Sequence, residues 1–177
     1  IVTDLQRLRL VSQRGTNKWK AMAHAFHGTL NINVTAIDSP DLSGLDVPKS
    51  LASMFESCES MTYGDSINNW NTSGVTDMSR MFAGTNAFNS PIGKWDVSSV
   101  TNMQAMFYES GFNKPLKDWN VENVTDMSSM FRYTDLFNQD ITGWDVSAVT
   151  NMQSMFERAL VFNQDIKGWN TRNVTDM

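Results

Sequence analysis

Hydrophobic residues recur along this chain with a fixed period of 24 or 25 residues. The clearest repeat begins at Trp95 and reads WDVSSVTNMQAMFYESGFNKP. Tryptophan opens every copy, and steps of 25, 24, 25 and 25 residues separate Trp70, Trp95, Trp119, Trp144 and Trp169. The short step arises because one residue is missing between Phe107 and Phe112. A period in this range is typical of a solenoid, in which each repeat forms one turn and packs on its neighbours.

Each regular repeat predicts a short helix followed by a short strand. In V-T-[DN]-M-x-x-M-F the Met and Phe spacing matches one face of a helix, and the threonine stands where an N-cap belongs. The predicted caps are Thr76, Thr101, Thr125 and Thr150, and Gln104 and Gln153 are placed to complete a capping box. The next segment, Phe-Asn-x-x-Ile/Leu, predicts one strand per turn in a narrow parallel sheet. Pro91 and Pro115 lack a backbone N–H and keep this sheet thin.

Rows of apolar side chains, one per turn, are predicted to form a continuous core. The tryptophan row is expected inside, with each indole N–H bonded to a backbone carbonyl, rather than on a sugar-binding surface. The methionines are better explained as packing than as copper or haem ligands. The other core rows are Met78, Met103, Met127 and Met152, and Phe82, Phe107, Phe131 and Phe156.

Polar residues also recur in rows. An asparagine follows the second phenylalanine of each repeat, and these residues are predicted to form an amide ladder from turn to turn rather than a ligand-binding row. They are Asn89, Asn113, Asn138 and Asn163. The residue after the threonine alternates between Asp and Asn, as in Asp77, Asn102 and Asp126. In stacked turns, alternation doubles the carboxylate spacing from ~5 Å to ~10 Å, about one Debye length. Duplication of a two-repeat unit also explains the alternation, and the two explanations are compatible.

The chain divides into three parts on this pattern. Residues 1–29 are predicted to form an N-terminal helical cap, and residues 30–66 to form two irregular edge repeats. Residues 67–177 contain the regular repeats. The last repeat is truncated at Met177, within the predicted helix, so we expect a partner or further chain at an open C-terminal end.

The first two parts carry weaker versions of the same elements. A first helix is predicted to end at Gly15, and a second, containing Met22 and Phe26, to end near Gly28. Alternating apolar residues predict a strand within 30–37. Leu51 opens the next predicted helix.

Charge and composition exclude several classes of function. Residues 1–20 hold five basic residues and one acid, whereas the remaining 157 hold nine basic and eighteen acidic residues. Nucleic acid is therefore not an expected ligand of the repeats. No apolar run approaches the ~18 residues of a membrane span. The single cysteine, Cys58, excludes an internal disulfide and is predicted to be a small buried residue.

Candidate catalytic and metal-binding chemistry is weak. No nucleophile has an evident partner, so no enzyme activity and no cofactor are predicted. The Asp and Asn rows lack a calcium-binding motif. His24 and His27 lie three residues apart on a predicted helix, but no Cys, Asp or second His pair nearby completes a site, so the prediction is no metal. Stacked Thr and Ser rows leave an ice-binding face as a minor alternative, although Glu122 and Arg172 interrupt the serine row.

The motif as a whole resembles a known family. DSPDLSG at residues 38–44, followed by iterated W-[ND]-[TV]-S-x-V-T-[DN]-M-x-x-M-F-x(5)-F-N, resembles the BspA-type leucine-rich-repeat surface proteins. The resemblance covers residues 30–177 and is weaker before residue 67. It implies an α/β fold, a right-handed leucine-rich-repeat-like solenoid with one short strand and one short helix per turn. It also implies display at an extracellular or cell surface, but transfers no binding residues.

These observations together predict a non-enzymatic binding, adhesion or scaffold module. Its repetitive face is expected to contact a protein or glycan partner. The alternative is a structural or linker subunit of a larger assembly, within an organellar or membrane-associated complex.

Overall fold

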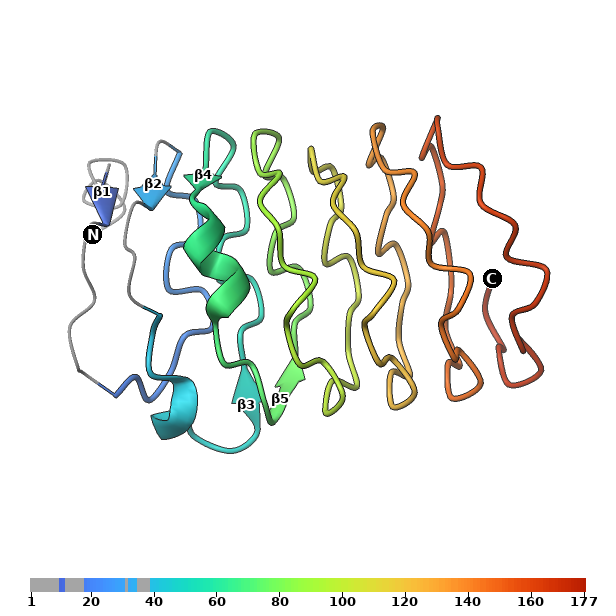
Figure 1. Ribbon diagram of the computed structural model, residues 1–177, viewed down its shortest axis with the longest axis horizontal. Coiled ribbons are helices and arrows are strands. Elements are labelled where there is room, and N and C mark those ends of the chain that lie inside the picture. The colour runs from blue at the N-terminus through green and yellow to red at the C-terminus, as the bar shows by residue number, and fades with distance from the viewer. Residues whose placement is uncertain (1–9, 12–17, 31, 35–38) are drawn as a thin grey trace.

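The chain forms a stack of coils. The structure is a computed structural model of the 177-residue chain, and it describes residues 10–11, 18–30, 32–34 and 39–177. Successive coils lie side by side along one axis, and the coil nearest the C-terminus forms one end of the stack (Figure 1). The repeat period of the sequence is therefore the length of one coil.

Short parallel strands link the first coils. Strands β1 (Leu10–Val11), β2 (Asn33–Val34) and β4 (Thr62–Tyr63) form a three-stranded parallel sheet. Strands β3 (Lys49–Ser50) and β5 (Val75–Asp77) form a second parallel pair. Single bridges continue from β5 through the regular coils and pair Asp77, Asn102, Asp126, Asn151 and Asp176 in succession.

The predicted helix in each repeat is wrong, and the predicted leucine-rich-repeat-like fold class is wrong with it. The described residues contain no α-helix, and their only helical elements are two 3₁₀ segments, Leu42–Gly44 and Asp65–Asn69. The Met-x-x-Met segment is instead a turn in which the Met81 N–H donates to the Met78 carbonyl at 3.2 Å. Its third residue, Arg80, has φ of 55°. A right-handed helix needs negative φ throughout, so this residue ends any helix.

Left-handed residues recur at two places in each coil, four residues apart. The first is the third residue of Met-x-x-Met, and the second follows the Met-Phe pair by two residues. In one coil these are Ala105 and Glu109, with φ of 53° and 51°. A chain of such turns brings apolar residues to one side every three or four residues, as a helix does. The sequence spacing therefore fitted both structures.

Backbone hydrogen bonds in this segment alternate between two kinds of partner. The N–H groups of Met81 and Ala83 donate within their own coil, to the carbonyls of Met78 and Arg80. The intervening N–H groups donate to the next coil at 2.7 to 3.0 Å, from Met78, Arg80, Phe82 and Gly84 to the carbonyls of Asn102, Gln104, Met106 and Tyr108. This alternation holds the two coils in one register.

The predicted strand after the second phenylalanine is also absent from the regular coils. Asparagine side chains join the coils there instead. The backbone N–H of each asparagine donates to the side-chain Oδ1 of the asparagine one coil earlier, at 2.9 to 3.2 Å, through Asn89, Asn113, Asn138 and Asn163. Pro91 and Pro115 cannot donate a backbone hydrogen bond. The side-chain amide therefore takes the place of a backbone ladder.

The threonine row does not cap helices, because there are none to cap. From Thr101 onward, each threonine Oγ1 donates to the carbonyl of the threonine one coil earlier at 3.1 to 3.2 Å, with acceptors Thr76, Thr101, Thr125 and Thr150. The predicted capping box at Gln104 and Gln153 is wrong for the same reason. Their backbone N–H groups donate to Oδ1 of Asn102 and Asn151 in local turns.

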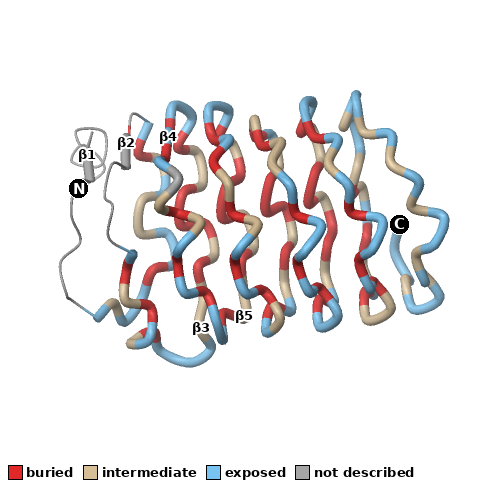
Figure 2. Tube along the Cα trace, in the orientation of Figure 1, coloured by how far each residue is buried: buried red, intermediate tan, exposed pale blue. Residues whose placement is uncertain are grey.

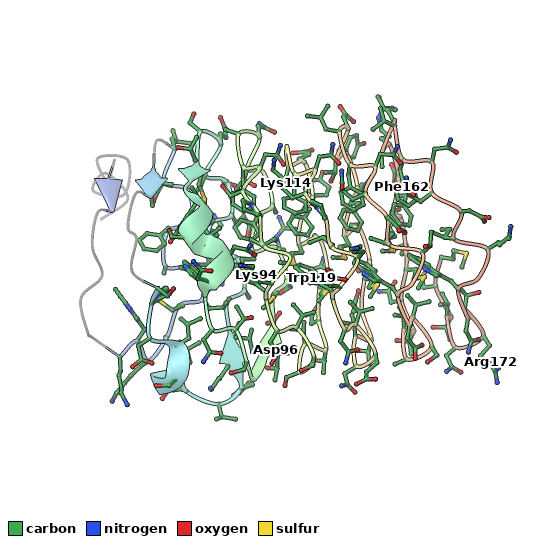
Figure 3. All side chains as sticks on the ribbon, viewed as in Figure 1. Lys94, Asp96, Lys114, Trp119, Phe162 and Arg172 are labelled. Atoms are coloured by element: carbon green, nitrogen blue, oxygen red, sulfur yellow. The ribbon has the colours of Figure 1, made fainter. Side chains whose placement is uncertain are left out.

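Aromatic and thioether side chains make up much of the buried core. Figure 2 shows buried positions recurring from coil to coil. The described phenylalanine rings stack face to face from coil to coil, and ring centroids lie 5.6 to 5.9 Å apart from Phe82 through Phe156. Trp119 lies in the middle of the stack (Figure 3), and its indole N–H donates to the Ile92 carbonyl of the preceding coil at 3.2 Å. The rows are buried up to the last coil, where Phe156 and Trp169 become half-exposed.

Alternating Asp and Asn residues line the column of single bridges. Adjacent members belong to adjacent coils, so Asp77 and Asp126 are separated by Asn102. Between Asn151 and Asp126 the amide Nδ2 donates to the carboxylate Oδ2 at 3.3 Å. Asparagine therefore separates carboxylates that would otherwise stand on neighbouring coils.

The N-terminal predictions are tested only in part. The predicted first helix lies outside the described residues except for Leu10–Val11, which form β1. The predicted strand within 30–37 overlaps β2. The helices predicted around Met22 and Leu51 are turns, with left-handed His24 and Ser53 at φ of 57° and 53°.

The short repeat tests this register directly. Its missing residue brings Gly111 against the preceding coil, where an added Cβ would lie 2.0 Å from the Asn86 carbonyl oxygen. We expect Gly111→Ala to lower the free energy of unfolding by about 1–3 kcal/mol or more, because backbone must move to admit the methyl group. Gly143→Ala is the matched control, since its Cβ meets nothing within 4 Å. Urea denaturation measures both, and equal stabilities would contradict the packing of the short coil.

Candidate functional site

Two adjacent positions in each coil break the repeat and change residue type from coil to coil. The first position follows the buried phenylalanine and is occupied by His27, Glu56, Ala83, Tyr108, Arg132 and Glu157. The second position comes next and is occupied by Gly28, Ser57, Gly84, Glu109, Tyr133 and Arg158. We call these twelve residues the variable face.

The backbone places the variable face in two straight columns. From Gly28 through Tyr133, the N–H of each second-position residue donates to the carbonyl of the first-position residue in the next coil. The shortest of these hydrogen bonds, at 2.7 Å, joins the Gly84 N–H and the Tyr108 carbonyl. The longest, at 3.0 Å, joins the Glu109 N–H and the Arg132 carbonyl. Coils joined in this way lie ~4.8 Å apart. Side chains that are far apart in sequence therefore become immediate neighbours.

Aromatic and guanidinium groups gather on the C-terminal half of the variable face. The Tyr108 and Tyr133 rings meet edge to face with centroids 5.9 Å apart. Arg132 lies over Tyr133, with its guanidinium carbon 5.1 Å from the ring centroid, and Arg158 approaches the same ring at 5.5 Å. Cation–π contacts of this kind orient the guanidinium groups without using all of their N–H donors.

Acidic residues complete this half of the face. Arg132 Nη2 donates to Glu157 Oε1 at 2.9 Å, and this hydrogen bond raises the pKa of Arg132 and lowers the pKa of Glu157. A hydrogen bond to Glu109, together with burial, raises the pKa of Tyr108. Both partners of the Arg132–Glu157 pair remain partly exposed, so the pair orients side chains more than it stabilises the fold.

A shallow hollow of about 90 Å³ interrupts the face in the middle. Its lining includes Ala83, the smallest residue of the first column, and Gly84, one of two glycines in the second. Glu56 flanks one side and Tyr108 the other. Arg80 borders the hollow, and its Nε and Nη2 both donate to Glu56 Oε1, at 2.9 and 2.6 Å. The hollow has room for a small side chain of a partner.

The C-terminal end of the stack carries a second, more apolar hollow of about 280 Å³. It is lined mainly by Met155, Phe156, Ile166, Trp169 and Met177, and we call this surface the end face. It exposes the same rows that are buried inside the stack.

The residues predicted from the sequence lie elsewhere in the coils. The Trp, Met and Phe rows are interior, and the Asn and Thr rows join coil to coil. None of these residues lies on the variable face, although Met152, Phe156 and Trp169 border the end face. The recurring residues of the sequence do not reveal the variable face. The informative signal was the opposite one, namely positions that fail to recur.

The comparisons with known proteins give a family and no activity. A family model described as "Mycoplasma protein of unknown function, DUF285" matches residues 20–117 and 109–177. The chain belongs to this family. No curated protein and no solved structure is significantly similar to it. Within the described part of the chain, no helix has the length and apolar character needed to cross a membrane.

The Arg80–Glu56 pair should make stability depend on pH. Burial alone would raise the pKa of Glu56, but hydrogen bonds from Arg80 and Ser53 outweigh it and leave this pKa below its ordinary value. A depressed carboxyl pKa stabilises the fold above the unfolded-state pKa, and this contribution is lost as pH falls through the folded-state value.

We therefore expect Glu56→Gln to lower the free energy of unfolding by about 1 kcal/mol at pH 7 and by much less near pH 3. Urea denaturation of both proteins at the two pH values provides the measurement. Glu59→Gln is the control, because Glu59 is an exposed acid three residues from Glu56. It should change the free energy of unfolding little at either pH. A Glu56→Gln effect that is the same at pH 3 and pH 7 would show that the ion pair does not stabilise the coils.

Proposed function

We propose that the protein is a non-enzymatic binding module that recognises a protein partner through the variable face. The observation that carries this proposal is the cluster of Tyr108, Tyr133, Arg132 and Arg158 on one surface of a regular scaffold. Tyrosine and arginine are enriched among residues that dominate binding energy at protein interfaces. The hollow beside Tyr108 adds a place for a partner side chain.

The second position of the variable face has left-handed backbone, as the turn requires in each coil. Glu109, Tyr133 and Arg158 have φ of 51° to 58°, a conformation that costs a side-chain-bearing residue on the order of 1 kcal/mol. Gly28 and Gly84 occupy the same position in other coils, so the fold accepts glycine there. The turn imposes this conformation off the variable face as well, at Ala105 and Ser129, so the fold tolerates the large side chains of the second position but does not require them.

The dimensions and charge of the face suit a protein. Six coils at ~4.8 Å spacing extend ~24 Å, comparable to one side of a standard interface. The face interleaves both signs of charge, with Arg132 and Arg158 beside Glu109 and Glu157. Such a mixed surface fits a mixed partner surface and does not favour the uniformly anionic backbone of a nucleic acid. The resemblance to BspA-type proteins supports presentation at a cell surface.

The end face supports an alternative function as a structural or linker subunit of an assembly. Met177 lines the apolar hollow and is 77% exposed. Arg172 lies at the same end of the stack (Figure 3). A partner subunit or a further coil packed on this end would bury the last aromatic row as the other coils bury theirs.

Binding of extracellular proteins and glycans in an array, followed by calorimetry on each ligand found, tests the proposal. We expect a protein ligand, and we expect Tyr133→Asn and Arg132→Ala each to weaken it by about tenfold or more. Asparagine tolerates left-handed backbone, so Tyr133→Asn removes the ring with little added strain. Lys117→Ala, at an exposed site outside the variable face, should leave affinity unchanged.

Three outcomes would overturn the proposal. One is binding that survives both variants, and another is an array in which only glycans bind. The third is concentration-dependent assembly in sedimentation velocity that Trp169→Lys abolishes, with no ligand found. This last outcome would favour the assembly function of the end face.

A further inference from the structure

Two histidines and a glutamate meet at the N-terminal end of the variable face. His24 and His27 lie in one coil, and Glu56 lies in the next. One ligand atom from each of the three residues lies within 4.8 Å of the other two. His27 Nδ1 is 3.7 Å from Glu56 Oε2, and the two imidazole centroids are 5.8 Å apart. The sequence search considered a nearby Cys, Asp or second His pair, and it did not consider Glu56, which lies 29 residues from His27 in sequence.

The coil backbone fixes where these side chains start. His24 is left-handed, with φ of 57°, and its N–H donates to the Ala52 carbonyl at 2.9 Å. The Gly28 N–H donates to the Glu56 carbonyl at 2.8 Å, which sets His27 beside Glu56. The imidazoles are exposed, whereas only 12% of the Glu56 side chain is exposed. The carboxylate thus has a set position, and the two rings can turn toward it.

We propose that His24, His27 and Glu56 bind one divalent transition-metal ion, with Zn²⁺ as the representative case. Two imidazoles and one carboxylate are a recurrent ligand set for zinc, and a water or a partner side chain fills the fourth position. Ligand atoms around tetrahedral zinc lie ~3.3 Å apart, given metal–ligand bonds of ~2.0–2.1 Å. Rotation of the two exposed imidazole rings brings the ligand atoms from their present separation of up to 4.8 Å to this shorter spacing. Magnesium and calcium are disfavoured because both prefer oxygen ligands.

Arg80 has two opposed effects on this site. Its guanidinium binds Glu56 Oε1, which leaves Oε2 directed toward His27 as the ligand atom. Groups that orient a metal-binding carboxylate in this way usually improve affinity. Its positive charge, however, repels a divalent cation across a short distance. Arg80 is therefore a positioning residue, and it also limits affinity.

Cys58 does not compete for the metal. Its thiol is buried, and it donates to the Phe26 carbonyl oxygen with Sγ 3.0 Å away. The thiol is therefore held in the interior, whereas both imidazoles are exposed. The chain has two histidines in total, so imidazole ligation reports on this site alone.

Metal binding would join the two coils that carry the ligands. His24 and His27 belong to one coil and Glu56 to its neighbour, so an ion held by all three binds only when those coils are stacked. An ion that binds the folded state and not the unfolded state raises the midpoint of thermal unfolding. This inference does not depend on the proposed protein partner.

Titration of the full chain, without a histidine tag, with ZnCl₂ by calorimetry tests the site. We expect one ion per chain, and a higher midpoint of thermal unfolding with zinc than without it. NMR should show both imidazole spin systems shifting together during the titration. His24→Asn, His27→Asn and Glu56→Gln should each weaken binding by about tenfold or more. His24→Asn keeps a residue that tolerates left-handed backbone.

The matched control is Glu109→Gln, which removes a carboxylate from the same face without touching the histidines. It should bind zinc as the unchanged chain does, and MgCl₂ should not shift the imidazole signals. Zinc binding that persists in both histidine variants would overturn the proposal. So would a titration in which the imidazole signals of the folded protein do not move.

Discussion

Hydrogen bonds from one coil to the next are the constraint on which the rest of this structure depends. In the turn that carries the Met-Phe pair, every second backbone N–H leaves its own coil and donates to its neighbour, as Phe82 does to Met106 and Phe107 to Met130. These bonds require one fixed register between coils. A shift of one residue would turn buried side chains outward on the whole segment. Because register is fixed, each position in the repeat becomes a column of side chains.

Columns of identical aromatic residues stabilise the interior of the stack, whereas columns of identical charged residues would destabilise its surface. Stacked phenylalanine and tryptophan rings gain contact with each added coil, which explains why these rows hardly vary. Stacked carboxylates at the same spacing would repel. Alternation of Asp77, Asn102 and Asp126 relieves this, because each bridge pairs a carboxylate with an amide. The variable face lies outside both kinds of column, so neither rule restricts the residue type there.

The interior of the stack can be predicted from the sequence, but the backbone that surrounds it cannot. The rows of Trp, Met and Phe follow from periodicity alone, since a residue repeated once per coil must lie in one column. The predicted helices failed because a four-residue spacing suits both a helical turn and two linked β-turns. Only the sign of φ separates the two, and residues such as Arg80 and Ala105 do not signal left-handed backbone. The predicted strands failed because asparagine side chains replaced the backbone donors and acceptors of a ladder.

The candidate sites could not be predicted from the sequence for a related reason. Tyr108, Arg132 and Tyr133 are unremarkable in sequence and form a cluster only when coils stack. His27 meets Glu56 across a spacing longer than the regular repeat, so the pair is not apparent before the edge coils are placed. Positions that depart from a repeat are therefore the ones to examine when the chain contains no catalytic motif.

Scalar coupling across hydrogen bonds, measured by long-range HNCO spectroscopy, tests the central claim most directly. The experiment links a donor amide nitrogen to its acceptor carbonyl carbon. The structure predicts correlations from Phe82 to Met106 and from Phe107 to Met130, each crossing from one coil to the next. Correlations from Phe82 to Met78 and from Phe107 to Met103 would instead show a helix in each repeat, and would contradict the stack of turns described above.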